Sequence, residues 1–343
     1  MPLRKTADSR PQIDDVSPVA AIPGGEIQMR GKNFGAEPRP TIAFGDLSGH
    51  LMFGSDSLLI VKVPDGVEEK QVTVGQNGKA SSPFPCAVGV QLSDGVHPVS
   101  NPAVDRDGMV YATLSGSRGQ KTPVSVFRVD PHIRQSTPFV SDIVNATGLA
   151  YDQSGMLYVS SRQEGNVYRV TPGGNSSVFV EGMGIATGIA FDAIGNLYVG
   201  DRSGTIFKVS TDRQIYVFTT LEPSISAYHL AFGPEGYLYV TGPTTSSHDA
   251  VHRVAPSGEV EMFYRGLGRP QGLAFDSAGN LYVAASMAGR RGIVRITPAK
   301  TASLFLSGPG VVGMAFAPAR ELIVATHSAL YRVAAGVEGR RLP

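Results

Sequence analysis

Polar side chains that could bind a ligand recur at intervals of about 40 residues in the second part of the chain. His229 is the candidate general base among them, because an imidazole titrates near neutral pH. Tyr228, which precedes it, could stack on a ligand ring. The other members of the set offer neutral hydrogen-bonding groups: Asn101, Asn145, Thr147, Thr187 and Gln271. These residue types favour ligand binding and leave one titratable group for catalysis.

Two further histidines, His248 and His327, fall in loops that we expect beside the same ligand. Asp, His and Ser residues all occur in these loops, but the sequence fixes no geometry among them, so it predicts no nucleophilic triad. The catalytic residues are therefore unknown, with His229 as the candidate. No metal site and no cofactor are predicted. The single cysteine, Cys86, excludes an intramolecular disulfide and a cysteine-rich zinc site.

The overall charge of the chain bears on its partners. Its 343 residues include 30 Lys and Arg against 29 Asp and Glu, a net charge of +1. A protein with so weak a field does not attract nucleic acid. The sequence contains neither a membrane-spanning apolar run nor a secretory signal, so we expect a cytoplasmic monomer without membrane insertion. An extracytoplasmic location would follow if the chain is a processed form.

The polar set belongs to an internal repeat that defines the larger part of the chain. The repeat carries the pattern Thr-Gly-Leu-Ala-Tyr-Asp or a close variant. Clear copies span 147–152, 187–192 and 271–276, and weaker copies begin at 100, 228 and 312. Six copies about 40 residues apart, five of them followed by three more short strands, predict an all-β fold with a six-bladed β-propeller over 91–343. The candidate residues then open the innermost strands, at the mouth of the central channel.

One strand is missing from this scheme. The sixth repeat ends in a turn-like segment and has no clear fourth strand. An unpaired sheet edge would remain there unless another segment covered it. We expect residues 86–92, which precede the first repeat, to supply this closing strand of blade six.

The repeats resemble NHL repeats and, more loosely, the SMP-30/gluconolactonase superfamily of six-bladed propellers, over about 96–343. The latter resemblance implies a site at the channel mouth, with a divalent metal held by Glu, Asn and Asp. The matching strand starts have other residues, Thr147-Gly148, Thr187-Gly188, Gln271-Gly272 and Val312-Gly313. A divalent cation, Ca or Zn, is therefore expected only if the protein is a hydrolase or lyase of this kind.

The first part of the chain follows a different pattern. After a flexible N-terminus (1–10), short apolar strands alternate with turns up to residue 90. The turn motifs are Ser17-Pro18, Gly24-Gly25, Gly31-Lys32-Asn33-Phe34-Gly35 and Val63-Pro64-Asp65-Gly66. Residues 11–90 resemble an IPT/TIG domain, an immunoglobulin-like β-sandwich. The resemblance implies a spacer or interaction module without chemistry of its own.

Two functions are consistent with these features. We favour a binding or scaffold protein that uses the propeller channel mouth to recognise a protein, peptide or glycan. The alternative is a gluconolactonase-like hydrolase or a lyase with its site at the same mouth. Enzymatic activity is left open by the sequence, with the non-enzymatic function preferred.

Overall fold

A computed structural model describes residues 10–35 and 37–340. The expected flexible N-terminus, 1–10, lies outside the described residues except for Arg10. The described chain forms two units. The first comprises the residues up to Val90 together with Leu304–Pro309, and the second comprises the remainder from Gln91 on. No helix within the described ranges is long and apolar enough to cross a lipid bilayer.

The first unit contains two β-sheets that share one hydrophobic core. One sheet has the order β1-β3-β7-β6, and the other has the order β10-β8-β4-β5 with β9 beside β8. Alternate residues of their strands, such as Ile27 and Leu59 in one sheet and Val72 and Phe44 in the other, are buried in this core. The strands of these two sheets are β1 (Gln12–Ser17), β3 (Glu26–Lys32), β4 (Thr41–Phe44), β5 (Leu47–Ser48), β6 (His50–Gly54), β7 (Leu58–Lys62), β8 (Gln71–Gln76), β9 (Lys79–Ala80) and β10 (Phe84–Pro85). Two short strands, β2 (Ala20–Ala21) and β11 (Ala87–Val88), belong to neither sheet: they pair in parallel with each other, and β2 pairs in parallel with Leu306 and Ser307.

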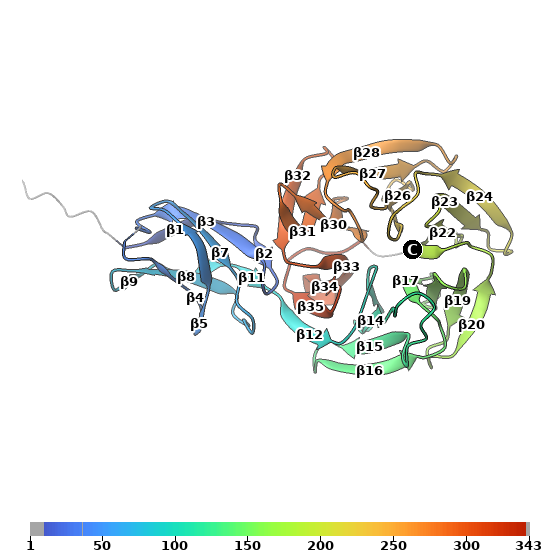
Figure 1. Cartoon of the computed structure of the whole chain (residues 1–343), viewed down its shortest axis with the longest axis horizontal. Coiled ribbons are helices and arrows are strands. Elements are labelled where there is room, and N and C mark those ends of the chain that lie inside the picture. Colours follow the sequence, from blue (N-terminus) through green and yellow to red (C-terminus); the bar gives the residue numbers. More distant parts are fainter. Residues whose placement is uncertain (1–9, 36, 341–343) are drawn as a thin grey trace, which may run out of the picture. The chain divides into compact units, whose positions relative to one another are not determined.

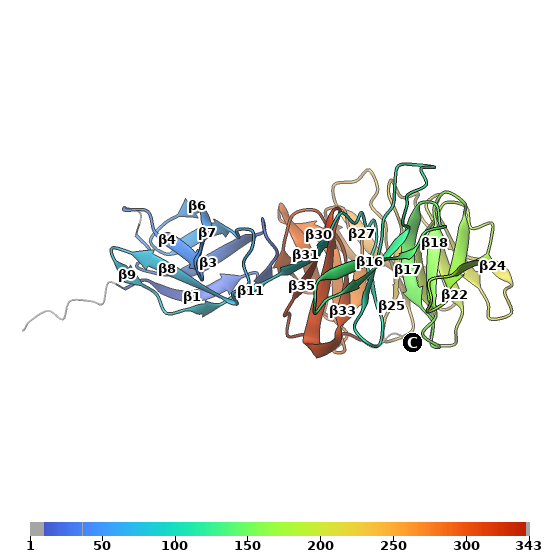
Figure 2. The same ribbon diagram turned by 90° about the horizontal axis from the view of Figure 1, so that it is seen from below.

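The second unit is a β-propeller. Within the described ranges, its blades are six groups of four strands around a central channel (Figure 1), although most of the outermost strand of blade five, Leu304–Ser307, groups with the first unit. The strands run along the axis of this ring, as the side view in Figure 2 shows. In each blade the innermost strand pairs with a second strand, the second with a third, and the third with an outermost strand.

The blades follow one another in chain order. Blade one consists of β13 (Ala103–Val104), β14 (Val110–Thr113), β15 (Val126–Asp130) and β16 (Gln135–Val140). Blade two consists of β17 (Ala146–Tyr151), β18 (Leu157–Ser161), β19 (Asn166–Val170) and β20 (Ser176–Val180). Blade three consists of β21 (Ala186–Phe191), β22 (Leu197–Asp201), β23 (Thr205–Val209) and β24 (Ile215–Thr220). Blade four consists of β25 (His229–Phe232), β26 (Leu238–Thr241), β27 (Asp249–Val254) and β28 (Val260–Leu267). Blade five consists of β29 (Leu273–Phe275), β30 (Leu281–Met287), β31 (Arg290–Ile296) and β32 (Ala302–Ser307).

Blade six draws its strands from both ends of the propeller sequence. Its order is β33-β34-β35-β12, with β33 (Val311–Ala317), β34 (Glu321–Thr326), β35 (Ala329–Val333) and β12 (Val90–Asp94). A short 3₁₀ turn, η1 (Pro318–Arg320), connects β33 to β34. The outermost strand, β12, precedes blade one in the chain and thereby closes the ring. Its first three residues fall within the 86–92 segment, whereas Cys86 belongs to the core of the first unit.

Burial follows the position of a strand within its blade. The second strands β18 and β22 are buried along their whole length, whereas the outermost strand β24 is mostly exposed. Adjacent blades share hydrophobic cores, and Val126 of blade one and Val159 of blade two lie in one such cluster. This packing holds the inner strands rigidly around the channel, which is the basis for a preformed site.

Candidate functional site

Glycines near the start of the inner strands let neighbouring strands touch. Gly148, Gly188, Gly272 and Gly313 occupy equivalent positions in four blades, and all are buried. A Cβ atom on Gly188 would meet the carbonyl oxygen of Tyr228 and would lie 2.9 Å from the Cα atom of His229. On Gly272 it would lie 2.6 Å from the Cα atom of Gly313. We call this level of the channel the glycine layer.

Asn101 and His229 take the place of glycine in blades one and four. The Nδ2 atom of Asn101 donates to the carbonyl oxygen of Leu273 at 2.8 Å, and its Oδ1 atom accepts from the backbone N–H of Met314 at 3.1 Å. One amide side chain thus ties the inner strands of blades five and six together. Because Asn101 uses both ends of its amide, it fills a structural role at this level.

His229 extends across the glycine layer. Its Nδ1 atom lies 3.4 Å from the Oγ atom of Ser100, which belongs to the opposite blade. Burial, together with the positive charge of Arg291, lowers the pKa of His229 to about 3. Its buried Nε2 atom has no hydrogen-bond partner among the described residues. The side chain is therefore a neutral, buried imidazole at the level of the glycine layer.

The other candidates at the channel mouth are buried and hydrogen-bonded within the fold. Thr147 Oγ1 donates to the carbonyl oxygen of Asn145, and Thr187 Oγ1 donates to that of Gly200. The hydroxyl of Tyr228 donates to the carbonyl oxygen of Glu222, and Gln271 accepts from Arg291. The structure therefore brings these residues together at one end of the channel, but their polar atoms serve the fold.

His248 and His327 lie apart from this group on exposed loops. The Nδ1 atom of His248 is 3.1 Å from the hydroxyl of its neighbour Ser247. The carbonyl oxygen of His327 lies 2.7 Å from the Nδ1 atom of His97. Neither imidazole reaches the channel residues. Within the described ranges, no group of three or more His, Cys, Asp or Glu side chains could hold a metal ion.

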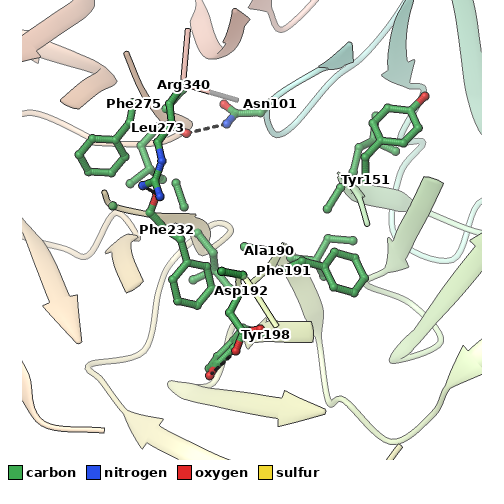
Figure 3. A pocket seen from close by; sticks show the side chains of 18 of the residues that line it. Asn101, Tyr151, Ala190, Phe191, Asp192, Tyr198, Phe232, Leu273, Phe275 and Arg340 are labelled. Carbon is green, nitrogen blue, oxygen red and sulfur yellow. Dashed lines mark hydrogen bonds between the residues drawn. The ribbon is translucent and has the colours of Figure 1, made fainter. Parts of the chain in front are cut away.

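A cavity of about 530 Å³ lies at the other end of the inner strands (Figure 3). We call the end where the inner strands begin the upper end, and the end where they finish the lower end. The cavity begins below the glycine layer and is lined by the second halves of the inner strands from all six blades. Of the candidate residues from the sequence, Asn101 alone contributes to this lining.

Six alanines create the space for this cavity. Every repeat has alanine two positions after the glycine layer, and all six of these alanines line the cavity: Ala103, Ala150, Ala190, Ala231, Ala274 and Ala315. Five of them are only half-buried, although they lie inside the propeller. We call them the alanine ring. The signal was present in the sequence as an alanine in all six copies, but a search for polar and titratable residues overlooks it.

In five of the six blades an aromatic residue follows this alanine and packs between blades, whereas blade one has Val104 in this position. The ring of Phe191 in blade three lies 4.8 Å, edge-on, from the ring of Tyr158 in blade two. Phe232 and Tyr198 repeat this contact at 5.0 Å. Edge-to-face pairs of this kind stabilise a core beyond the area that they bury. These aromatic side chains thus join blades and also form the outer wall of the cavity.

The repeated aspartates cap turns at the lower end. Asp192 accepts from the backbone N–H groups of Ile194 and Asn196 at 3.1 and 2.8 Å. The hydroxyl of Tyr198 also donates to this carboxylate, at 3.4 Å. The same arrangement recurs in blades one, two and five with Asp105, Asp152 and Asp276. These acids are structural turn caps, a common role of carboxylates that follow a strand.

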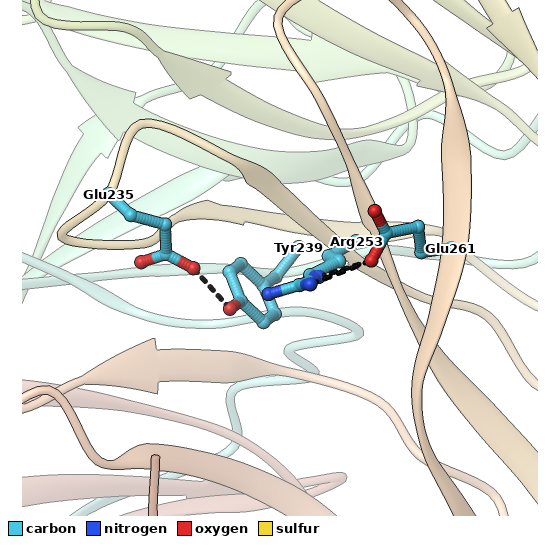
Figure 4. A network of polar contacts seen from close by, with 4 residues as sticks. All are labelled: Glu235, Tyr239, Arg253 and Glu261. Carbon is cyan, nitrogen blue, oxygen red and sulfur yellow. Dashed lines mark hydrogen bonds and ion pairs between the residues drawn. The ribbon is translucent and has the colours of Figure 1, made fainter.

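Blade four keeps this tyrosine but replaces the aspartate with Gly233. The hydroxyl of Tyr239 donates instead to Glu235, two residues further along the turn (Figure 4). Beside the same tyrosine, Arg253 donates to Glu261 of β28 at 2.7 Å. In blade six, where Ala317 replaces the aspartate, the tyrosine position is occupied by Ile323. A hydrogen-bond acceptor is thus retained wherever the buried tyrosine is present.

Arg340 brings a charge to the cavity wall. Its backbone N–H donates to the carbonyl oxygen of Phe275 at 3.0 Å. Its Nη1 atom donates to the carbonyl oxygen of Phe232 at 3.1 Å (Figure 3). Among the described residues Arg340 forms no ion pair. The guanidinium therefore keeps donors and a full positive charge for a ligand at the edge of an apolar cavity.

The β-propeller fold is shared with solved proteins of several activities. An auxiliary nutrient binding protein from Bacteroides thetaiotaomicron is 12% identical, with a TM-score of 0.55 and coverage of 94% of this chain and 97% of that one. A gluconolactonase from Xanthomonas campestris is 14% identical (TM-score 0.57; 72% and 89% covered). Virginiamycin B lyase from Staphylococcus aureus is 15% identical (TM-score 0.51; 69% and 80% covered).

Comparison by sequence gives no relative of this chain. No protein-family model matches it, and no curated protein matches it either. At the identities of the solved structures, the likeness establishes the fold alone. The chemistry of the site therefore depends on the side chains of this chain.

Proposed function

We propose that this protein is a non-catalytic binding protein whose ligand occupies the cavity at the lower end of the propeller channel. The alanine ring carries this proposal, because six small side chains at equivalent positions leave room that larger residues would fill. Preformed, largely apolar cavities of this size are typical small-molecule sites. The likeness to a nutrient binding protein of the same fold is compatible with this function.

The lining selects the kind of ligand. Leucine, isoleucine, methionine and aromatic side chains surround the alanine ring, including Leu230, Leu273 and Met314. An apolar group therefore gains from burial here, whereas the hydroxyls of a glycan would lose hydrogen bonds to water. Of the protein, peptide and glycan ligands open from the sequence, a peptide side chain fits this lining. A small amphiphile fits it better, with its apolar part in the cavity and an anionic end at Arg340.

The gluconolactonase-like alternative would place catalysis at the upper end. Its support is the fold shared with a gluconolactonase. Most of the candidate polar groups at that end are engaged within the fold, and His229 is a neutral, buried imidazole. A divalent cation, Ca or Zn, belongs to this alternative only. Hydrolysis of a lactone that responds to a chelator would favour the alternative over simple binding.

In this proposal the second unit binds the ligand, and the first unit has an accessory role. Its two sheets and shared core are compatible with an IPT/TIG-like, immunoglobulin-like sandwich over residues 11–90. We likewise infer that the blades of the second unit are NHL-like repeats. We assign the first unit the role of a spacer or interaction module, because the candidate binding groups lie in the second unit.

Titration with 8-anilinonaphthalene-1-sulfonate tests this function, since the probe combines apolar rings with an anionic sulfonate. We expect saturable binding to one site, with a rise in fluorescence. Ala190→Leu and Ala274→Leu each place a larger side chain in the alanine ring and should abolish binding. The control is Ala278→Leu, on an exposed turn of blade five that does not line the cavity. Equal binding by all three variants would refute the proposal.

A further inference from the structure

Two arginines at the upper end of the channel have no part in the cavity. Arg162 and Arg202 directly follow β18 and β22, the second strands of adjacent blades. Their backbone N–H groups donate to equivalent carbonyls just before the inner strands, Arg162 to Asn145 at 3.3 Å and Arg202 to Ile185 at 3.1 Å. The repeat thus places both residues at matching positions on the same end of the propeller.

Backbone carbonyls alone hold the two guanidinium groups. The Nη2 atom of Arg162 donates to Gly116 at 2.9 Å, and the Nε atom of Arg202 donates to Ser224 at 3.3 Å. Within residues 10–35 and 37–340, neither arginine has an ion-pair partner. In the same ranges the buried Nε atom of Arg162 has no hydrogen-bond partner. A guanidinium carries five N–H donors, so most donors of both groups remain for a ligand.

Asn145 positions the first of these arginines. Its buried Nδ2 atom donates to the carbonyl oxygens of Gly116 and Ser117 at 2.8 and 3.0 Å. Its Oδ1 atom accepts from the backbone N–H of Gly119 at 2.8 Å. The carbonyl oxygen of Gly116 therefore receives bonds from both Asn145 and Arg162. The orientation of Arg162 is thus fixed by a buried network and is not that of a free surface side chain.

The positive charges at this end have an electrostatic cost. Burial lowers the pKa of Arg162, and the charge of Arg202 adds to this effect. In blade five, burial and the charge of Arg269 lower the pKa of Arg291 to about 10. Arg291 likewise donates to neutral groups, among them the carbonyl oxygen of Arg269 at 2.9 Å. Like charges in a partly desolvated region repel one another, and an anion bound among them would offset this repulsion.

We propose that Arg162 and Arg202 form a binding site for an oxyanion at the upper end of the propeller. The ligand is a small molecule with a carboxylate or phosphate group, because the planar guanidinium fork pairs with both. The site is separate from the cavity, which lies below the glycine layer. Asn145 is a positioning residue for this site, since it holds the loop that orients Arg162.

Isothermal titration calorimetry at constant ionic strength tests the site with two probes, inorganic phosphate and D-gluconate. Sodium chloride is the reference salt. We expect saturable binding of at least one probe, and the tighter of the two identifies the oxyanion class. Arg162→Gln and Arg202→Gln should each weaken this binding by about tenfold or more. Thermal unfolding of each variant confirms that it is folded.

The matched control is Arg106→Gln. Arg106 is exposed and also donates to a backbone carbonyl, that of Gln153 at 2.9 Å, but it lies in a turn at the lower end. This variant loses the same charge and should keep the wild-type affinity. The absence of saturable binding of both probes, or equal weakening by Arg106→Gln and Arg162→Gln, would overturn the proposal. Because the naphthalene probe occupies the cavity, its binding should be unchanged in Arg162→Gln, which separates the two sites.

Discussion

The Nδ1 atom of His229 and the Oγ atom of Ser100 lie 3.4 Å apart across the propeller channel, on opposite blades. This contact lies at the level of the glycine layer, between the polar and basic groups of the upper end and the apolar cavity of the lower end. It also places the most distinctive candidate residue of the sequence in a buried position, where its effect on stability can be measured.

Folding stability should fall in acid because of His229. Its pKa is about 3 in the folded protein and about 6.5 in an unfolded chain, so between these values only the unfolded state binds the proton. This difference in proton binding has no effect on stability above pH 6.5, and it lowers the free energy of unfolding progressively as the pH falls toward 3. Between pH 7 and pH 5 the free energy of unfolding should fall by about 2 kcal/mol for this reason. Urea unfolding of the wild type and of His229→Gln at several pH values measures this loss, which the variant should lack. An identical pH dependence of the free energy of unfolding in both proteins would contradict the prediction.

The glycine layer should tolerate no side chain. Gly188→Ala would place a methyl group against backbone atoms of Tyr228 and His229, which cannot move aside as a flexible side chain can. We expect a loss of about 1 to 3 kcal/mol in the free energy of unfolding. Gly173→Ala is the control, because its new Cβ would have no neighbour closer than 3.9 Å. A similar loss in both variants would show that the layer is not tightly packed.

Glu235 should substitute for the missing aspartate of blade four. Glu235→Ala removes the acceptor of the Tyr239 hydroxyl and should cost about 1 kcal/mol or more. Gly233→Asp alone should also destabilise the protein, because a Cβ atom there would lie 2.6 Å from the Cε2 atom of Tyr239 and 2.7 Å from the Oε2 atom of Glu235. The double variant removes the second of these contacts and supplies an aspartate as in other blades, so it should recover part of the loss. Denaturant unfolding of all three variants tests this rescue, and strictly additive losses would refute it.

Arg340 should matter for anionic ligands only. In Arg340→Met, the affinity for 8-anilinonaphthalene-1-sulfonate should fall by about twofold to fivefold, as expected for a partly exposed charge pair. The neutral probe N-phenyl-1-naphthylamine should bind equally to the variant and the wild type. Fluorescence titration of both probes gives the comparison. A parallel loss of both affinities would assign Arg340 a purely structural role.

Cys86 should report on the unfolding of the first unit. It lies in the core of that unit, and burial raises the pKa of its thiol to about 12. The reactive species is the thiolate, so the native protein should not react with a disulfide reagent such as dithiobis(nitrobenzoate) at pH 8. Reaction should begin as urea unfolds the first unit. Rapid labelling of the folded protein would contradict the burial of this side chain.

The propeller was predictable from sequence because its repeat is periodic in both hydrophobicity and turn residues. The copies at 147–152 and 187–192 have the same glycine, alanine and aspartate, and these positions have the same roles in the structure. The basis for the prediction was therefore a local pattern that each blade uses in the same way.

The location of the cavity was not predictable in the same way. It depends on how closely the inner strands approach one another, which the structure shows at Gly188 and Gly272. Polar residues such as Thr187 and Gln271 looked suited to a ligand, but their partners are backbone groups of neighbouring strands and an arginine from another strand. Those contacts depend on tertiary structure. Alanine is overlooked for the opposite reason, since its contribution is the volume that it leaves empty.

The alanine ring has a consequence for ligand orientation. A ring of six equivalent alanines would offer a ligand six equivalent poses, related by rotation about the channel axis. Arg340 removes this degeneracy, because it is bonded to the carbonyl oxygen of Phe232 and places its charge beside a single blade. A repeated scaffold thus provides the space, and one residue outside the repeats distinguishes one orientation from the other five.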